Sequence, residues 1–230
     1  MTQRCIVVLG MHRSGTSMLM GTLREAGLYV GDVLDKPFAL NRKGLQEPPA
    51  VLYMHEHLLE ANGGSWHSPP KDVQWDKMHE AIRDLFIESR TGKSLWGFKD
   101  PRTLLTLEGW KSALPNLELV GIFRHPSEVA LSLKNRNDFD SEKSLNLWLH
   151  YNQRLLDIHR SAPFPLVEFH QNVAKMRDEL TRMIEQTQMP LQLRANDLTF
   201  FEGGIRTYSS TLSLPESVAA LYHELRERAV

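Results

Sequence analysis

Short apolar runs alternate along the chain with longer segments in which apolar residues recur every three or four positions. The apolar runs predict buried strands over 5–9, 94–98, 117–123 and 165–169. The helical spacing predicts helices over 18–26, 50–60, 73–91, 103–113, 127–135, 141–160, 171–187 and 215–226. Because strands alternate with helices, the pattern predicts an α/β fold, a three-layer sandwich whose central parallel sheet is covered by helices on both faces.

The same pattern gives local expectations for individual helices and loops. In the third predicted helix, Ile82, Leu85 and Phe86 share one face and are expected to point toward the core. Ser127 stands at the start of the fifth predicted helix and is expected to be its N-cap. The segments expected to be loops, and to form the walls of a binding site, are 32–49, 62–70 and 135–141.

Length and composition indicate one ordinary globular domain. The chain has 230 residues, 41% hydrophobic and 24% charged, so we expect a single domain over 1–230. Its net charge of −1 gives no reason to expect nucleic acid or an anionic membrane as partner. Cys5 is the only cysteine, which excludes an intramolecular disulfide and a cysteine-based metal site. No apolar run matches a signal-peptide core or a membrane span, so the expected location is the cytoplasm.

The loop after the first predicted strand has the composition of an anion-binding loop. It reads Gly10-Met11-His12-Arg13-Ser14-Gly15-Thr16-Ser17 and leads directly into a predicted helix. Such a loop points backbone N–H groups and the positive end of the helix dipole at one spot, which suits phosphate or sulfate. The alternative is a glycine turn that only joins a strand to a helix, and the two glycines, the arginine and the three hydroxyls favour the anion site.

This loop departs from the nucleotide-binding P-loop pattern G-x-x-x-x-G-K-S/T at one informative position. Gly10, Gly15 and Ser17 match the pattern, but Thr16 takes the place of the lysine. The basic residue is Arg13, three positions earlier. Because the lysine binds the β- and γ-phosphates in enzymes that use ATP or GTP, its loss indicates an anion other than a triphosphate.

Basic residues also follow the next two predicted strands. Lys99 and Arg102 follow the second strand and Arg124 follows the third. Parallel strands end at one rim of the sheet, where ligands bind. Ser132 comes eight residues after Arg124 on a helix, and its side chain is expected to lean back toward the strand end. Together they suit a phosphate monoester, whereas the alternative is a capping arginine and a solvent-facing serine.

Two motifs resemble one known family. V-L-G-M-H-R-S-G-T-S is similar to the 5′-phosphosulfate loop of sulfotransferases that use 3′-phosphoadenosine 5′-phosphosulfate (PAPS). Arg124 and Ser132 resemble the 3′-phosphate motif of that family, with His125 in place of its usual acidic residue. Trp148, Tyr151 and Asn152 also resemble a pattern of bacterial sulfotransferases, although such residues are usually core.

The resemblance implies a P-loop-like sulfotransferase fold with PAPS as donor and adenosine 3′,5′-bisphosphate (PAP) as product. A late loop around 200–206 loosely resembles the segment that closes over the nucleotide, although a surface turn is as good an interpretation. No metal-ligand cluster is apparent, so we expect no metal requirement. The residues expected to bind the donor are His12, Arg13, Ser14, Gly15, Thr16, Ser17, Arg124, Ser132 and Arg206.

Sulfuryl transfer needs a general base for the acceptor hydroxyl. Glu47 follows the first helix at about the distance at which glycan sulfotransferases carry their catalytic glutamate. A glutamate placed near a helix start for the helix dipole is about equally plausible. Asp100 is the second candidate, and His55 and His57 are further options.

Two cations are candidates for stabilising the transferred group. Arg13 lies in the phosphate loop and Lys99 at the end of the second strand. Lys99 could hold the oxygen that bridges sulfur and phosphorus, while Arg102 could do the same or bind the acceptor. Fixed positive charge at that oxygen lowers the barrier.

The resulting hypothesis is a sulfotransferase that acts on a hydroxyl of a small molecule or carbohydrate. The alternatives are a P-loop kinase of small molecules that uses ATP and a non-catalytic nucleotide-binding module. Thr16 stands in place of the usual lysine, and Arg124 stands in place of the metal-binding aspartate, so both argue against the kinase. The identity of the acceptor and the oligomeric state are not encoded in a readable pattern.

Overall fold

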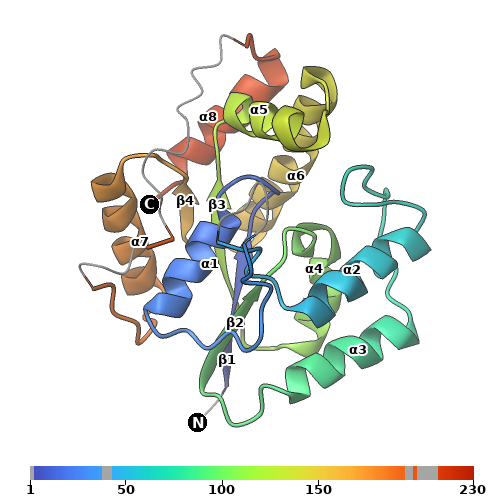
Figure 1. The fold of residues 1–230 in the computed structure, drawn as a ribbon, viewed down its shortest axis with the longest axis vertical. Helices are drawn as coiled ribbons and strands as arrows, with labels where there is room; N and C mark the ends of the chain where they lie inside the picture. Colours follow the sequence, from blue (N-terminus) through green and yellow to red (C-terminus); the bar gives the residue numbers. More distant parts are fainter. Residues whose placement is uncertain (1–2, 38–42, 195–198, 201–211) are drawn as a thin grey trace.

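A sheet of parallel strands forms the centre of the molecule. The structure is a computed structural model that describes residues 3–37, 43–194, 199–200 and 212–230. The strands are β1 (Arg4–Leu9), β2 (Leu95–Lys99), β3 (Leu117–Phe123) and β4 (Leu166–Glu168). They lie in the order β2-β1-β3-β4 and every pairing is parallel (Figure 1). The predicted parallel sheet is confirmed, and β1 and β3 are direct neighbours.

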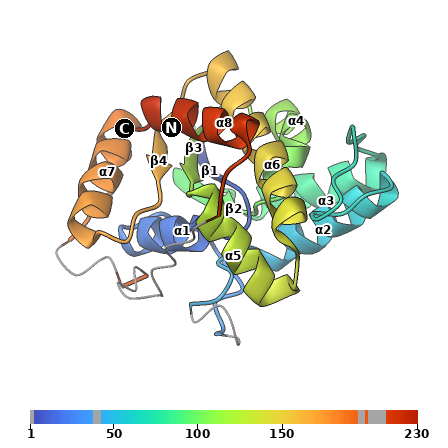
Figure 2. The same ribbon diagram turned by 90° about the horizontal axis from the view of Figure 1, so that it is seen from above.

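Helices cover both faces of this sheet, as the alternation of elements predicts. Ile6 and Val8 point to the face on which α1 (Thr16–Glu25) and α7 (Val173–Gln186) pack (Figure 2). Cys5, Val7 and Leu9 point to the opposite face, because side chains alternate along a strand. The helices on that face are α2 (Pro49–Ala61), α3 (Lys77–Glu88), α4 (Thr103–Ala113), α5 (Pro126–Asn137), α6 (Ser141–Ser161) and α8 (Glu216–Glu227).

The inner face of α3 differs from the prediction at one position. Phe86 is buried and Ile82 packs against the core, but Leu85 is 66% exposed, so its predicted burial was wrong. Arg83 takes the inward place and donates a hydrogen bond to the Gly109 carbonyl oxygen at 2.7 Å. Apolar spacing misses this arrangement because the aliphatic stem of an arginine packs like an apolar side chain.

The starts of α3 and α5 are set by capping side chains that the pattern did not identify. Asp76 caps α3, which therefore begins later than predicted. In α5 the N-cap is His125, whose Nδ1 accepts a hydrogen bond from the Ser127 backbone N–H at 3.2 Å, so the prediction of Ser127 as cap was wrong. Pro126 occupies the first helical position, which suits its fixed φ and missing N–H. α5 also ends later than predicted, which shortens the expected loop before α6.

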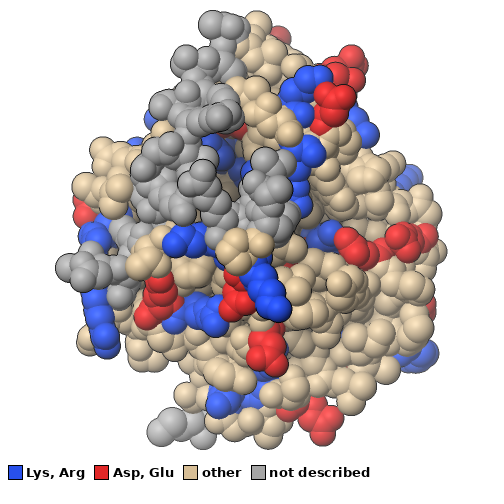
Figure 3. Space-filling model, in the orientation of Figure 1, with Lys and Arg blue, Asp and Glu red and all other residues tan. Residues whose placement is uncertain are grey.

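Surface charge is mixed on the face of the molecule seen in Figure 3, where Lys and Arg are interspersed with Asp and Glu. This distribution agrees with a net charge of −1. Within the described ranges, no helix has both the length and the apolar character needed to span a bilayer.

Candidate active site

The loop between β1 and α1 can form only with glycine at two positions. A Cβ on Gly10 would lie 2.4 Å from the Ile122 carbonyl oxygen of β3. Gly15 has φ of 92°, in the left-handed region, and a Cβ there would lie 2.4 Å from the Phe169 ring. Gly15 is also the N-cap of α1 and provides no side chain to bond the first N–H groups of the helix. Those N–H groups are therefore available to an anion.

Replacing Gly15 with alanine is expected to destabilise the fold by about 2–4 kcal/mol, since it adds left-handed strain and a steric clash. The matched control is Gly63→Ala, because Gly63 has φ of 75° with nothing within 4 Å of the added Cβ. The control should lose only the strain term, about 1–2 kcal/mol. Chemical denaturation measures both free energies of unfolding, and equal losses would contradict the assigned contact with Phe169.

Arg13, Arg124 and Ser132 meet beside this loop, as the sequence predicts for the ends of neighbouring strands. Arg13 Nε donates to Ser132 Oγ at 2.7 Å, and Arg124 Nη1 donates to the Arg13 carbonyl oxygen at 3.4 Å. Arg124 Nε also donates to Glu128 Oε2 at 2.6 Å. Ser132 thus contacts the arginine of the loop rather than Arg124 itself, and the three side chains still form one cluster.

The electrostatics of this cluster favour a bound anion. Burial lowers the pKa of Arg13 to about 10, and the neighbouring charges of Arg136 and Arg124 act in the same direction. Ser14 is fully buried, and its Oγ has no hydrogen-bond partner in the described part of the chain. Crowded guanidinium groups and an unpaired buried hydroxyl are both stabilised when a phosphate or sulfate binds between them. The sequence analysis did not identify Arg136 as a member of this cluster, although it lies four residues after Ser132 on the same helix face.

Trp148, Tyr151 and Asn152 support this cluster from α6. Trp148 Nε1 donates to the Arg124 carbonyl oxygen at 2.9 Å, and Asn152 donates to the Trp148 carbonyl oxygen at 2.8 Å. Tyr151 is fully buried and its hydroxyl donates to the Trp66 carbonyl oxygen at 2.8 Å. These three residues therefore belong to the core, and Trp148 also fixes the backbone at Arg124.

Lys99 and Glu47 form a buried ion pair next to the loop. Lys99 is 1% and Glu47 4% exposed, and Lys99 Nζ lies 2.8 Å from Glu47 Oε1. Lys99 Nζ also donates to Ser17 Oγ at 3.2 Å and to the Leu45 carbonyl oxygen. Burial raises the pKa of Glu47, although the charge of Lys99 opposes this shift. A buried carboxylate of raised pKa is a suitable proton acceptor.

Backbone pairing holds the segment that carries Glu47 in place. The Leu34 N–H donates to the Glu47 carbonyl oxygen, and the Gln46 N–H donates to the Leu34 carbonyl oxygen, both at 2.9 Å. Gly44 permits the turn before this pair because its φ is 72° and a Cβ would meet the Asp35 backbone. These contacts place Glu47 beside the end of β2.

Asp100 occupies a buried network rather than an open position. Its Oδ1 accepts hydrogen bonds from the Arg102 backbone N–H at 2.8 Å and from Arg102 Nη1 at 3.0 Å. Its Oδ2 lies 3.3 Å from His55 Nδ1. Despite complete burial, the charge of Arg102 and the bond with His55 hold the pKa of Asp100 well below its usual range. This geometry favours Glu47 over Asp100 as proton acceptor.

Each candidate histidine packs against an aromatic ring or another histidine. The His12 ring lies 4.5 Å from the Trp66 ring centroid, and its Nε2 is buried with no hydrogen-bond partner among the described residues. Burial lowers the pKa of His12 well below its usual range, and the charge of Arg102 adds to the effect. His55 Nε2 accepts a hydrogen bond from Trp110 at 2.9 Å inside the core, and His57 Nδ1 contacts His79 Nε2 at 2.9 Å.

One residue at a strand end lies apart from this cluster, and one predicted donor-binding residue lies outside the described part of the chain. His170, at the end of β4, contacts Glu179 at 3.2 Å and takes no part in the arginine cluster. Arg206 lies outside the described residues. Among residues 3–37, 43–194, 199–200 and 212–230, no three His, Cys, Asp or Glu side chains are placed to hold a metal ion.

Comparison with known structures supports the same fold. The sulfotransferase domain of the Synechococcus PCC 7002 olefin synthase is 16% identical, with a TM-score of 0.64 over 98% of this chain and 95% of that one. The sulfotransferase domain from the curacin biosynthetic pathway is 15% identical, with a TM-score of 0.61 over 98% of both chains. A Mycobacterium avium sulfotransferase is 15% identical, with a TM-score of 0.51 over 86% of this chain and 67% of that one.

Sequence comparison gives the family itself. No curated protein sequence matches the chain significantly. The family model described as "Sulfotransferase family" matches residues 5–192, which include the loop, the arginine cluster and the Lys99–Glu47 pair. This match extends over more than half of the chain, and the chain belongs to the sulfotransferase family.

Proposed function

We propose that the protein transfers a sulfuryl group from PAPS to a hydroxyl group of a small-molecule or carbohydrate acceptor. The observation that carries this proposal is the meeting of the β1–α1 loop with Arg124 and Ser132, from neighbouring strands. PAPS carries anions at both ends of one nucleotide, a 5′-phosphosulfate and a 3′-phosphate. The loop N–H groups suit the first anion, and Arg124 with Ser132, to which Arg13 already donates a hydrogen bond, suits the second.

The Lys99–Glu47 pair supports an acid–base role beside the phosphosulfate position. Lys99 already contacts Ser17 of the loop at 3.2 Å, so its ammonium can stabilise the charge that develops on the bridging oxygen. Glu47, 2.8 Å from Lys99, would accept the proton of the attacking hydroxyl. If Lys99 turns toward the leaving oxygen, Glu47 loses its positive partner and becomes a stronger base.

The donor is tested by comparing thermal stabilisation by PAP with that by ATP and magnesium. At about 100 times its Kd, PAP should raise the free energy of unfolding by about 2.7 kcal/mol, and Tm by about 5–10 °C. ATP with magnesium should produce a smaller shift because Thr16 stands where a kinase places its lysine. A larger shift with ATP and magnesium would favour the kinase alternative and reject PAPS as donor.

A further inference from the structure

Among the described residues, four that are not glycine have a positive φ, and two of these lie beside the proposed active site. Asp138 and Gln188 follow the ends of α5 and α7, where a left-handed residue commonly closes a helix. The other two are Arg13 in the phosphate-binding loop, with φ of 68°, and Gln46 directly before Glu47, with φ of 58°. A left-handed backbone is costly for a residue with a side chain and persists where the surrounding structure fixes it.

The left-handed turn at Gln46 brings oxygen atoms of its two neighbours onto one cation. The Leu45 carbonyl oxygen accepts a hydrogen bond from Lys99 Nζ, and Glu47 Oε1 lies 2.8 Å from the same nitrogen. In an extended chain the carbonyl groups point sideways, whereas side chains point above and below the strand, so these two oxygens would diverge. The turn at Gln46 therefore directs the Glu47 carboxylate to Lys99.

The Gln46 side chain holds this turn through both ends of its amide. It is 1% exposed, its Oε1 accepts a hydrogen bond from Arg24 Nη1 at 3.2 Å, and its Nε2 donates to the Lys43 carbonyl oxygen at 2.7 Å. Arg24 lies in the last turn of α1, the helix that begins in the phosphate-binding loop. The amide thus ties the segment before Glu47 to the helix that follows the proposed donor site.

Glutamine at position 46 combines backbone strain with contacts that glycine could not make. Glycine would adopt the left-handed conformation freely, as Gly44 does two residues earlier with φ of 72°. It would also lose both amide hydrogen bonds and leave the backbone less confined. The strain at Gln46 is therefore retained together with the bonds that fix the direction of Glu47.

We infer that Gln46 is a positioning residue, which fixes the Glu47 carboxylate on Lys99 through its left-handed backbone and its two amide hydrogen bonds. The inference rests on the proposed function, in which Glu47 accepts the proton of the attacking hydroxyl. Gln46 acts through Glu47 and takes no proton itself, because an amide is not a base at neutral pH and both of its ends are bonded.

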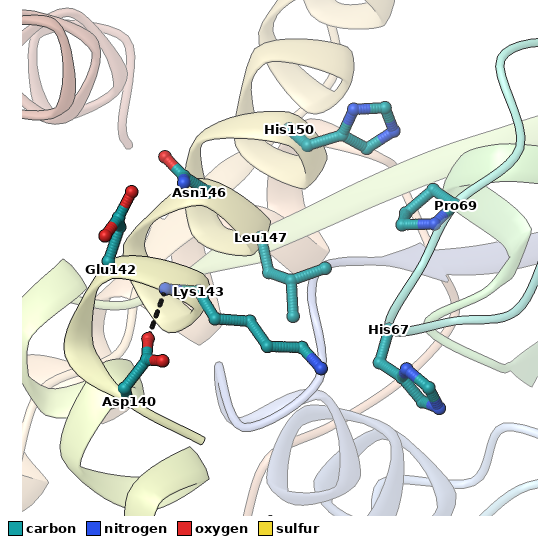
Figure 4. Close-up of a pocket in the computed structure, with 8 residues that line it drawn as sticks. All are labelled: His67, Pro69, Asp140, Glu142, Lys143, Asn146, Leu147 and His150. Carbon is teal, nitrogen blue, oxygen red and sulfur yellow. Dashed lines mark hydrogen bonds between the residues drawn. The ribbon is translucent and has the colours of Figure 1, made fainter.

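The 43–47 segment takes no part in the cavity drawn in Figure 4. That cavity has a volume of about 410 Å³ and lies between the 62–70 segment and the start of α6, where the carboxylates of Asp140 and Glu142 accompany the ammonium of Lys143. None of its lining residues in the described part of the chain comes from 43–47. Variants of Gln46 therefore leave the walls of this cavity unchanged.

The first test uses chemical denaturation and needs no acceptor. Valine at position 46 disfavours the left-handed region and makes neither hydrogen bond. The Lys99–Glu47 pair should then already be disturbed in Gln46→Val. Adding Glu47→Gln to it should shift the denaturation midpoint by less than about half of the shift that Glu47→Gln causes alone. The matched control is Gln188→Val, an exposed glutamine with φ of 49° at the end of α7, with which the shift should be fully additive.

The second test separates positioning from stability. With labelled PAPS and 2-naphthol as a probe hydroxyl compound, Gln46→Val should lower kcat about 10–100-fold while the Kd for PAP stays within a few-fold. Gln46→Asn should recover most of this loss, because asparagine accepts a left-handed backbone more readily than valine. Gln188→Val should keep the kcat of the unchanged protein.

The outcomes separate this inference from the proposed function. Full additivity of Gln46→Val with Glu47→Gln, or no shift from Glu47→Gln alone, would overturn the inference, because Gln46 would then hold no contact of measurable strength. A kcat of Gln46→Val equal to that of Gln188→Val, or no recovery in Gln46→Asn, would overturn it too.

Loss of PAP binding in Gln46→Val would assign Gln46 to the donor site and would also contradict the inference. Failure of the unchanged protein to bind PAP would instead overturn the proposed function. In that case, or if 2-naphthol is not labelled, the denaturation experiment still decides whether Gln46 holds Glu47 on Lys99.

Discussion

Replacing Glu47 with glutamine is expected to lower kcat about 10²–10⁴-fold while the Kd for PAP stays within a few-fold of the original. Glutamine keeps the shape of the side chain and a hydrogen-bond acceptor for Lys99, but it cannot take a proton. The unchanged protein should also lose activity as pH falls, since the base must be ionised. Its acid limb should lie above the usual range of a glutamate, because burial raises the pKa of Glu47. That limb should be absent in Glu47→Gln.

The control for this experiment is Glu56→Gln. Glu56 is a half-exposed glutamate that pairs with Arg102 at 2.7 Å, so the change also removes one negative charge near the site. It should change kcat by no more than a few-fold. Denaturation curves measure the effect of leaving Lys99 buried without a charged partner. A kcat of Glu47→Gln close to that of the control would assign the base to Asp100 or to a histidine.

Replacing Arg124 with alanine is expected to weaken PAP binding about 10–100-fold, because charge-assisted hydrogen bonds to a phosphate are lost. Isothermal titration calorimetry measures the Kd directly. Arg124→Lys should give an intermediate Kd, since it restores the charge without the paired N–H groups of a guanidinium. Arg154→Ala is the matched control, because Arg154 pairs with Glu108 at 2.7 Å on the surface between α6 and α4.

Glu128 complicates the interpretation of the Arg124 variant in a way that can be tested. Its carboxylate pairs with Arg124 at 2.6 Å and, left alone, would repel the phosphate. The double variant Arg124→Ala with Glu128→Gln therefore separates loss of attraction from new repulsion. An unchanged Kd for PAP in both variants would remove Arg124 from the donor site.

The sequence alone predicted most of the fold and the place where its basic residues meet. β3 and α4 have the predicted bounds because their apolar patterns are strong and end at a turn or a polar segment. The meeting of Arg13 and Arg124 follows from a general property of parallel sheets, whose strands all end at one rim. Neither prediction needs knowledge of side-chain contacts.

The details that the sequence could not decide depend on contacts between distant segments. Leu85 and Arg83 flank the face formed by Ile82 and Phe86 on opposite sides, and the hydrogen bond to the Gly109 carbonyl oxygen favours the inward position of Arg83. Asp100 and Glu47 are both carboxylates, and the sequence does not show which of them is enclosed by other side chains. The contact with His55 on α2 places Asp100 in a closed network. The orientation of His12 likewise depends on Trp66 in another loop. Local periodicity contains no information on such pairs.

The pairing of β1 with β3 has a consequence for how the protein matures. Arg13 and Ser132 are separated by 119 positions, and the strands that bring them together flank a long intervening segment that includes β2. A nascent or truncated polypeptide that lacks β3 would have the glycine loop but no partner for it. Nucleotide affinity should therefore develop late in folding, after the slow pairing of strands that are distant in the sequence. The donor would then bind and stabilise only the fully folded conformation.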